Sequence, residues 1–214
     1  MATNATKARL IHSANATLET GGHIRYEQVK FDCTSGSPYT WSASWAYPVD
    51  LLSGEMFGVA KPDGTEAAVT GDEFSSWVEG AVGFADGAAA VNDTVITVDA
   101  SVALAFDVGD CVKFAGHATV YAVEGVDEVA NTITLAGTGL DTAVVNDELI
   151  YLVRYFIGTA AAPILLGPLV RSHVWGQDTS DSTQVPPGFT FYIKYKNNQG
   201  ADDKTIYGQL AYLY

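Results

Sequence analysis

The sequence predicts an all-β protein: a jelly-roll-like β-sandwich with an inserted small β-barrel and one short helix. Three observations lead to this fold class. Apolar and polar residues alternate at period two towards both ends of the chain, as in half-buried strands. Two runs of small residues, 83–90 and 158–163, bracket a middle segment. Within that segment, short apolar stretches are separated by turn residues, which is typical of a small closed barrel.

Two strands are expected before residue 60. In the first, residues 23–33, alternate apolar residues up to Cys33 share one face. In the second, residues 39–47, aromatic residues lie on one side and small polar residues on the other. Pro48 ends this strand, because proline cannot donate to a sheet ladder.

The short helix is expected to begin at Thr70. The run from Thr70 to Glu73 matches a capping box, in which the two side chains satisfy backbone N–H groups at a helix start. Apolar residues follow at helical spacing: Phe74, Trp77, Val78 and Ala81.

The bracketed segment shows a weak internal repeat at an offset of 37 positions. Each copy contains a strand, a loop, a Gly-Asp or Asn-Asp turn and a second strand, and a further strand is expected over 118–126 between the copies. The aligned positions are Ile96, Thr97, Val98, Val108, Asp110, Val112 and Phe114 with Ile133, Thr134, Leu135, Val145, Asp147, Leu149 and Tyr151. Closing such strands into a barrel would remove exposed sheet edges.

Beyond the bracket, alternation returns over 189–195 and 206–214, with a polar loop over 197–203, and indicates a C-terminal hairpin. Strands before residue 60 and after residue 150 must combine to bury their apolar faces. We therefore expect a discontinuous outer sandwich over 1–88 and 153–214, and an inserted acidic barrel over 89–152.

The charge of the chain is concentrated in its middle. The whole chain has 25 acidic and 11 basic side chains, a net charge of −14. Residues 63–148 alone hold 16 acidic and 1 basic side chain, a net charge of −15. Such acidity disfavours a nucleic-acid partner, because binding requires neutralisation of phosphates. The longest apolar stretch, 156–170, is interrupted by Gly and Pro and is too short for a membrane helix, so no membrane partner is expected.

No motif in the sequence predicts a metal or cofactor site. Cys33 and Cys111 lie far apart and outside any C-x-x-C pair, so two reduced thiols are expected, although a bridge is possible. The histidines are scattered without helical metal-site spacing and are more simply surface or half-buried residues: His12, His23, His117 and His173. We expect no metal and no cofactor.

Motifs for catalysis are also absent. Residues 137–140 lack the third glycine and following helix of a phosphate-binding fingerprint and indicate a loop between strands. The acid pairs 127–128 and 202–203 could in principle serve glycoside hydrolysis, but neighbouring strand residues point to opposite faces. Ser172 and His173 are only neighbours in sequence, outside a Gly-x-Ser-x-Gly elbow. The protein is therefore expected not to be an enzyme.

Aromatic stripes are the best candidates for contact with a partner. They would serve either as sandwich core, as a protein interface or as a flat platform for sugar rings. The candidate interaction residues are Trp41, Trp45, Tyr47, Tyr192 and Tyr212. The polar loop 177–184 is expected to be an exposed surface loop that could also make contacts.

The middle segment resembles the small β-barrel modules of virion proteins from tailed bacteriophages. In those modules a T-I-T-V strand, a V-G-D-x-V-x-F/I-x-G strand and turn, a Y-x-V strand and a T-I-T-L strand recur in that order. The corresponding residues here are 94–98, 106–116, 120–123 and 132–135. The resemblance covers about 60 of the 214 residues and rests on common strand and turn residues.

The resemblance implies a non-enzymatic virion subunit: a head decoration (cement) protein, or a head-tail or tail component. Such a protein would be made in the host cytoplasm, pack on capsid or other virion proteins and on its own copies, and stabilise the capsid. On this hypothesis the sandwich packs inward and the acidic barrel faces solvent. The alternatives are a tail or receptor-binding component that contacts host carbohydrate, and a secreted carbohydrate-binding β-sandwich, which lacks support from a signal segment.

Overall fold

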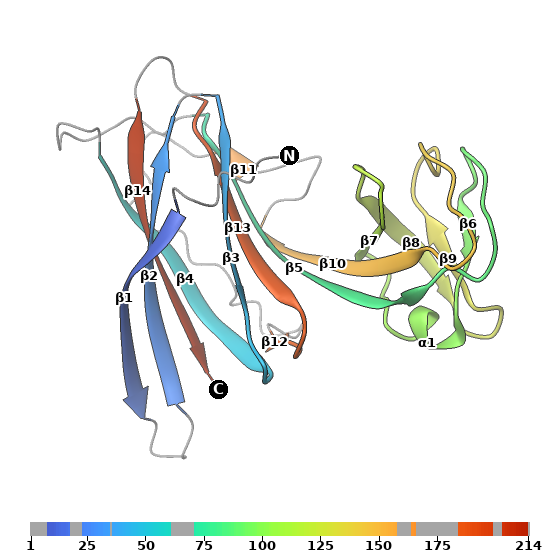
Figure 1. The fold of residues 1–214 in the computed structure, drawn as a ribbon, viewed down its shortest axis with the longest axis horizontal. Coiled ribbons are helices and arrows are strands. Elements are labelled where there is room, and N and C mark those ends of the chain that lie inside the picture. The colour runs from blue at the N-terminus through green and yellow to red at the C-terminus, as the bar shows by residue number, and fades with distance from the viewer. Residues whose placement is uncertain are drawn as a thin grey trace. The chain divides into compact units, whose positions relative to one another are not determined.

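The structure, a computed structural model, describes residues 8–17, 23–34, 36–60, 71–157, 164–165, 184–198 and 203–213. The chain divides into two compact units (Figure 1). Unit 1 contains residues 1–77 and 156–214, and unit 2 contains residues 78–155. The segment 89–152, expected as the insert, therefore lies within unit 2.

Unit 1 has two antiparallel sheets. The first has the order β1-β2-β14-β4-β12 and consists of β1 (Ala8–Thr17), β2 (His23–Cys33), β14 (Lys204–Leu213), β4 (Val49–Ala60) and β12 (Gln184–Val185). In the second, β3 (Pro38–Ser44) pairs with β13 (Thr190–Lys196), β5 (Glu73–Phe84) follows β13, and β11 (Ile164–Leu165) pairs with β5. The expectation that early and late strands share sheets is confirmed, because β14 lies between β2 and β4.

The strand order is that of a jelly roll. Eight strands of unit 1, taken along the chain, are β2, β3, β4, β5, β11, β12, β13 and β14. Counted from one to eight, they form one sheet in the order 1-8-3-6 and another in the order 2-7-4-5, which is the double Greek key of the jelly roll. β1 extends the first sheet at its edge. The all-β, jelly-roll-like fold class is confirmed.

The helix expected from Thr70 is wrong, because residues 73–84 form strand β5. Two polar residues of the expected helix start, Asp72 and Glu73, make tertiary contacts instead. Asp72, fully buried, accepts hydrogen bonds from the Tyr195 hydroxyl and the Asn198 backbone N–H. Burial and this carboxylate raise the pKa of Tyr195. Glu73 accepts bonds from Asn198 and Lys196, which lower its pKa. Contacts with β13 and its following loop thus override the helical spacing.

The C-terminal hairpin is also wrong, since β13 and β14 belong to different sheets. The predicted alternation itself is correct: Phe191, Ile193 and Tyr195 are buried. In a jelly roll successive strands pass from one sheet to the other, so the loop after β13 carries the chain across the sandwich instead of folding it back.

Unit 2 is a closed ring of strands. It contains parts of β5 and of β10 (Leu149–Ile157), together with β6 (Val95–Thr97), β7 (Cys111–Phe114), β8 (Tyr121–Asp127) and β9 (Thr132–Leu135). The order β5-β10-β7-β8-β9-β6 is closed at residues 84–86. There, Ala85 bonds to Asp147 and Glu148 on one side, while its neighbours bond to residues 97 and 99 on the other. No edge strand remains in this ring.

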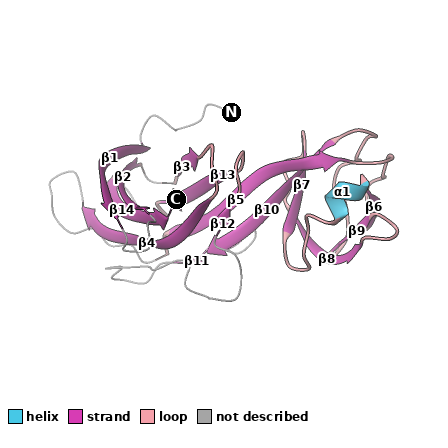
Figure 2. Ribbon diagram, turned by 90° about the horizontal axis from the view of Figure 1, so that it is seen from below, coloured by secondary structure: helices cyan, strands magenta, loops and turns pink. Residues whose placement is uncertain are grey.

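The ring encloses a core of apolar side chains. Its buried residues include Ile96, Val98, Phe106, Val112, Phe114, Tyr121, Val123, Ile133, Leu135, Leu140, Val144, Ile150 and Leu152. The helix α1 (Ala100–Ala103) lies between β6 and β7 in the chain and is the only helix in the described part of the protein (Figure 2). The helix is thus a single turn in unit 2.

The internal repeat has a structural counterpart, with one correction. Its first strands are partners, since Ile96 lies opposite Ile133 in the β6–β9 ladder. Its second strands, β7 and β10, are also antiparallel partners. The buried Val112 and Phe114 correspond to the buried Ile150 and Leu152. The alignment of these second strands with Leu149 and Tyr151 is therefore one residue out, because those side chains are only half-buried.

Candidate functional site

The first aromatic stripe packs into the sandwich. Along β3 and the residues after it, Trp41 and Trp45 are half-buried and alternate with exposed serines. Trp41 meets Phe191 edge-on, with ring centroids 6.4 Å apart. Trp45 meets Tyr212 at 5.0 Å and so links the two sheets of unit 1. Tyr47 is 41% exposed and lies on the surface.

The other two aromatic candidates differ from each other. Tyr212 is buried within unit 1, with 1% of its surface exposed. Tyr192 is half-buried and stacks on Trp77, with ring centroids 5.1 Å apart and planes 14° apart. The five candidates therefore do not form one platform. Trp41, Trp45 and Tyr212 pack against other aromatic rings of the sandwich. Tyr47 is exposed, and Tyr192 stacks on Trp77 of β5.

Three turns of unit 2 share one geometry, and two of them are the Gly-Asp and Asn-Asp turns expected in the internal repeat. They span Ala90–Asp93, Asp107–Asp110 and Val145–Glu148. In each, the carboxylate of the fourth residue accepts the backbone N–H of the first, and the fourth N–H returns to the first carbonyl. The third residue has a positive φ of 74°, 102° or 62°. Gly, Asn or Asp followed by Asp or Glu is the signal that could have revealed all three.

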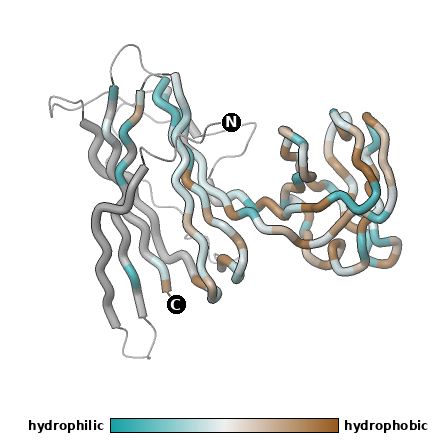
Figure 3. Tube along the Cα trace, viewed as in Figure 1, coloured by the Kyte–Doolittle hydropathy of each residue, from teal (hydrophilic) through white to brown (hydrophobic). Residues whose placement is uncertain are grey.

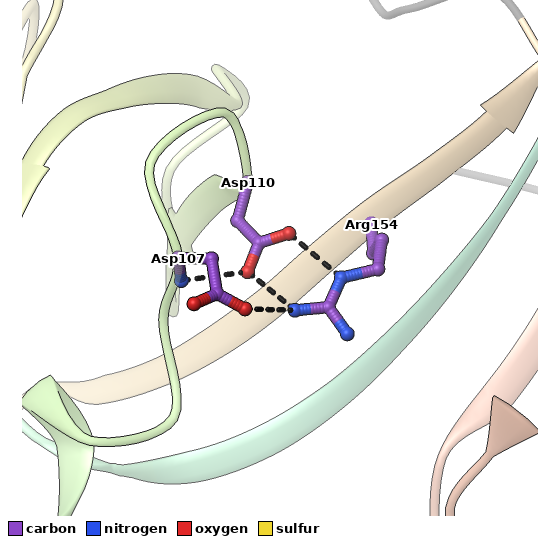
Figure 4. A network of polar contacts seen from close by, with 3 residues as sticks. All are labelled: Asp107, Asp110 and Arg154. Atoms are coloured by element: carbon purple, nitrogen blue, oxygen red, sulfur yellow. Dashed lines mark hydrogen bonds and ion pairs between the residues drawn. The ribbon is translucent and has the colours of Figure 1, made fainter. Parts of the chain in front are cut away.

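One of these turns is tied to β10 by an ion pair (Figure 4). Arg154 donates to Asp110 through two nitrogens, Nε at 2.7 Å and Nη2 at 2.6 Å, and Nη2 also lies 3.4 Å from Asp107. The Asp110 side chain is nearly buried, whereas that of Asp107 is exposed. A bidentate guanidinium fixes both distance and orientation, so the pair holds the turn rigidly on β10.

A second polar network surrounds His117 in the turn before β8. His117 Nδ1 lies 3.1 Å from the Tyr121 hydroxyl, which donates to Asp141. Thr119 donates to the same carboxylate. Burial, and then the bond to Asp141, raise the pKa of Tyr121 to about 12. Hydrogen bonds from Thr119 and Tyr121 lower the pKa of Asp141. On its other side, His117 Nε2 lies 3.5 Å from Glu148 Oε1.

Several large apolar side chains are exposed on unit 2. They are Phe84, Val91, Val95, Leu104, Val108, Val129 and Val145. Tyr47 of unit 1 is exposed as well. Figure 3 shows hydrophobic positions in both the strands and the loops of unit 2. Val129, at the tip of the β8–β9 turn, is 95% exposed. Exposed apolar residues on one unit mark it as a candidate contact surface.

The two units also differ in charge, although less than the sequence segments suggest. Unit 2 has 12 acidic and 2 basic side chains, a net charge of −10, and unit 1 has 13 and 9, a net charge of −4. The charge of unit 2 differs from the −15 of residues 63–148 because the unit has other bounds. Asp63, Glu66, Asp72 and Glu73 belong to unit 1, and Arg154 belongs to unit 2.

Cys33 and Cys111 are both thiols, in units 1 and 2 respectively. Burial, followed by the charge of Asp110, raises the pKa of Cys111. Across the described ranges, no three His, Cys, Asp or Glu side chains gather as a metal site would need. Nor does any helix within them have the length and apolarity to cross a membrane. His173 and residues 177–183 of the polar loop lie outside the described residues, and Gln184 begins β12.

Comparison with known proteins gives only remote likenesses. No protein-family model and no curated protein matches the chain. Among solved structures, the VP16–VP17 complex of the two major capsid proteins of bacteriophage P23-77 aligns with a TM-score of 0.19 and 9% identity, over 89% of this chain and 97% of that one. VP17 of the same phage gives 0.18 and 7%, over 95% and 98%. The Washington University polyomavirus VP1 pentamer gives 0.17 and 11%, over 87% and 74%.

Proposed function

We propose that the protein is a non-enzymatic structural subunit of a virus particle, of the capsid decoration type found in tailed bacteriophages. It would pack on capsid protein and on its own copies and would strengthen the particle. Its place would then be the virion, after synthesis in the host cytoplasm. Unit 2 would be a β-barrel module inserted into the jelly roll.

One observation carries this proposal. The four segments that resemble phage barrel modules, residues 94–98, 106–116, 120–123 and 132–135, contain β6, β7, the start of β8 and β9. These strands complete a closed ring together with β5 and β10, and the segment interrupts a jelly roll between β5 and β11. The jelly roll is a fold of viral capsids and also of lectins and cupins, so it favours a virion role only together with the inserted module.

The surface of unit 2 supports a contact role. Leu104 and Val108 follow α1 in one loop, and both are exposed beside acidic residues of the same segment. Covering such side chains would release about 25 cal/mol for each Å² of apolar surface buried. The net charge of −10 on unit 2 opposes contact between two copies of that unit. Copies of the protein would therefore meet through unit 1, and unit 2 would contact a different virion protein instead of facing solvent as the sequence suggested.

Particle binding tests the proposal. Virus particles from the natural host are banded by density, stripped of this protein, and mixed with the purified chain. The intact chain should return to the particle band. The double variant Leu104→Asp, Val108→Asp should bind at least about tenfold less, and the control Thr138→Asp, an exposed polar site of the same unit, should bind normally. A chain absent from purified particles would contradict the virion role. Normal binding by the double variant would contradict only the contact surface.

A further inference from the structure

The outer edge of β3 leads to an inference about how copies of the protein meet. β3 is the terminal strand of the second sheet of unit 1: it pairs with β13 on one side, and no described strand follows it on the other. A terminal strand turns half of its backbone N–H and C=O groups away from its sheet. From Thr40 to Ser44, β3 therefore presents a row of donors and acceptors to a further strand.

β3 lacks the features that usually keep an edge strand from pairing with another chain. Proteins protect such edges with charged side chains, β-bulges or proline. β1, a terminal strand of the first sheet, contains Arg9 and has a bulge between Leu10 and His12. β3 keeps a regular register with β13 over its whole length, contains no charged residue, and has its one proline at its first position. β3 is thus an edge of unit 1 that is suited to pairing.

The residues of β3 match a second copy of the same strand. In an antiparallel pair centred on Trp41, this residue lies opposite its own copy, and Thr40 lies opposite Ser42. Tyr39 then lies opposite Ala43, a large side chain against a small one. Aromatic pairs and pairs of hydroxyl side chains both stabilise neighbouring strands. Because the pattern is symmetric about Trp41 and uncharged, a second copy of this chain is the partner that fits it.

The surroundings of β3 also suit this contact. Trp41 is opposite the buried Ile193 and meets Phe191 edge-on, yet it is only half-buried. On the other face of the strand, Ser42 is exposed. Unit 1 has a net charge of −4 against −10 for unit 2, so repulsion opposes contact between copies of unit 1 less strongly. A second β3 would cover the remaining surface of Trp41 and satisfy the outer backbone groups.

We propose that β3 pairs with β3 of a second copy, antiparallel and centred on Trp41, so that the second sheets of the two copies join across a two-fold axis. The inference deepens the proposed function, in which copies meet through unit 1, and rests on it only for that role. The pairing is a property of the purified chain. It can therefore fail while the chain still binds particles, and it can hold for a chain that is absent from particles.

Analytical ultracentrifugation of the purified chain tests the pairing. The natural protein should show a dimer that dissociates on dilution. Ser42→Lys places a charge at an exposed site of the edge and near its copy across the axis, and should weaken the dimer at least about tenfold. Thr138→Lys makes the same change of charge at an exposed site of unit 2 and should dimerise normally.

Two outcomes of this experiment would overturn the proposal. The first is a dimer of unchanged affinity in Ser42→Lys, which would place the contact elsewhere. The second is a natural chain that stays monomeric at every concentration. If the β3 amides of such a monomer gained protection from hydrogen exchange only on particles, the edge would instead hold an extended segment of another virion protein.

Disulfide crosslinking tests the register. Directly opposite residues of an antiparallel pair have Cα atoms about 4.5–5.5 Å apart, within the range of a disulfide. A mixture of Thr40→Cys and Ser42→Cys chains should therefore form crosslinked dimers under mild oxidation, faster than either variant alone. The natural protein, with Cys33 and Cys111 only, is the control for the native thiols. Equal crosslinking of the mixture and of either variant alone would overturn the register centred on Trp41.

Discussion

Replacing Gly139 by Ala should destabilise unit 2 far more than the same change at Gly137. Both glycines lie in the loop between β9 and β10, and both have left-handed backbones, with φ of 78° and 76°. A Cβ added at Gly137 would meet nothing within 4 Å. One added at Gly139 would lie 2.7 Å from the Asn92 carbonyl oxygen and closer still to that of Asp93. The two sites therefore share their backbone strain and differ in space.

The expected magnitudes follow from these two terms. Placing an L-residue in the left-handed region costs about 1–2 kcal/mol, and both variants bear that cost. Any gain from a stiffer unfolded chain is also common to both. Gly139→Ala must in addition move backbone, because the obstructing atoms are the carbonyl oxygens of residues 92 and 93. This backbone is fixed by hydrogen bonds: the Asp93 carbonyl accepts the Leu140 N–H at 3.0 Å, and the Asn92 N–H donates to the Leu140 carbonyl at 2.8 Å. Overpacking typically costs about 1–3 kcal/mol more.

Urea unfolding, followed by a probe in unit 2 such as the amide hydrogen exchange of Leu140, measures the difference. We expect Gly137→Ala to lose about 1 kcal/mol and Gly139→Ala about 2 kcal/mol beyond that. Faster exchange of the Asn92 and Leu140 amides should accompany the larger loss, since their mutual contacts are the ones displaced. Equal losses for the two variants would show that the two loops are not in the close contact described.

Three further outcomes are expected. Arg154→Met should cost about 2–4 kcal/mol, because it leaves the nearly buried Asp110 carboxylate without its guanidinium. Lys113→Met, which removes a one-point ion pair with Glu79 and a cation–π contact with Tyr151, should cost less than about 1 kcal/mol in the same denaturation assay. Similar losses for the two variants would contradict the greater strength of the bidentate pair. The pKa of Tyr121 is about 12 in the folded protein and about 10 in an unfolded chain. The protonated hydroxyl therefore stabilises the fold fully below about pH 10, and this stabilisation is lost towards pH 12. Tyr121→Phe should show a shallower loss of stability at alkaline pH, and an unchanged alkaline slope would refute this. Thiol labelling of the native protein at pH 8 should be slow at both cysteines, because Cys33 is buried and the pKa of Cys111 is raised. Labelling of the unfolded protein should reach two thiols per chain. Rapid labelling of Cys33 in the native protein would contradict its burial.

The fold class could be predicted because many strands of this protein bury one face, and such strands show an alternation of apolar and polar residues in the sequence. Phe191, Ile193 and Tyr195 are such a case. What the pattern could not provide was the partner of each strand. The same period two fits a hairpin and two strands in opposite sheets, and only the jelly-roll topology separates β13 from β14.

The helix error has a related cause. The residues from Thr70 to Ala81 fit a helical face, but Ser75, Ser76 and Gly80, which lie off that helical face, are buried as well. A strand between two neighbours in a sheet accepts this burial, whereas an amphipathic surface helix keeps one face polar. Periodicity cannot detect the second buried face when small polar residues form it.

The candidate interaction residues show the limit of composition arguments. Trp45 and Tyr212 come from distant parts of the sequence and meet between two sheets, which no local pattern indicates. The exposed valines of the unit 2 turns had the opposite problem: they look like core residues in the sequence, and Val108 becomes exposed only because the Asp107–Asp110 turn points it outward.

The place of the insertion has a consequence for how such a protein can change over generations. β5 enters unit 2 and β10 leaves it, and these two strands are neighbours in the sheet order. Paired strands lie about 4.8 Å apart, so the chain returns close to where it departed. A gene could therefore gain, lose or exchange the segment between them as one cassette, joined by a short loop, and still encode all eight strands of the jelly roll in their order.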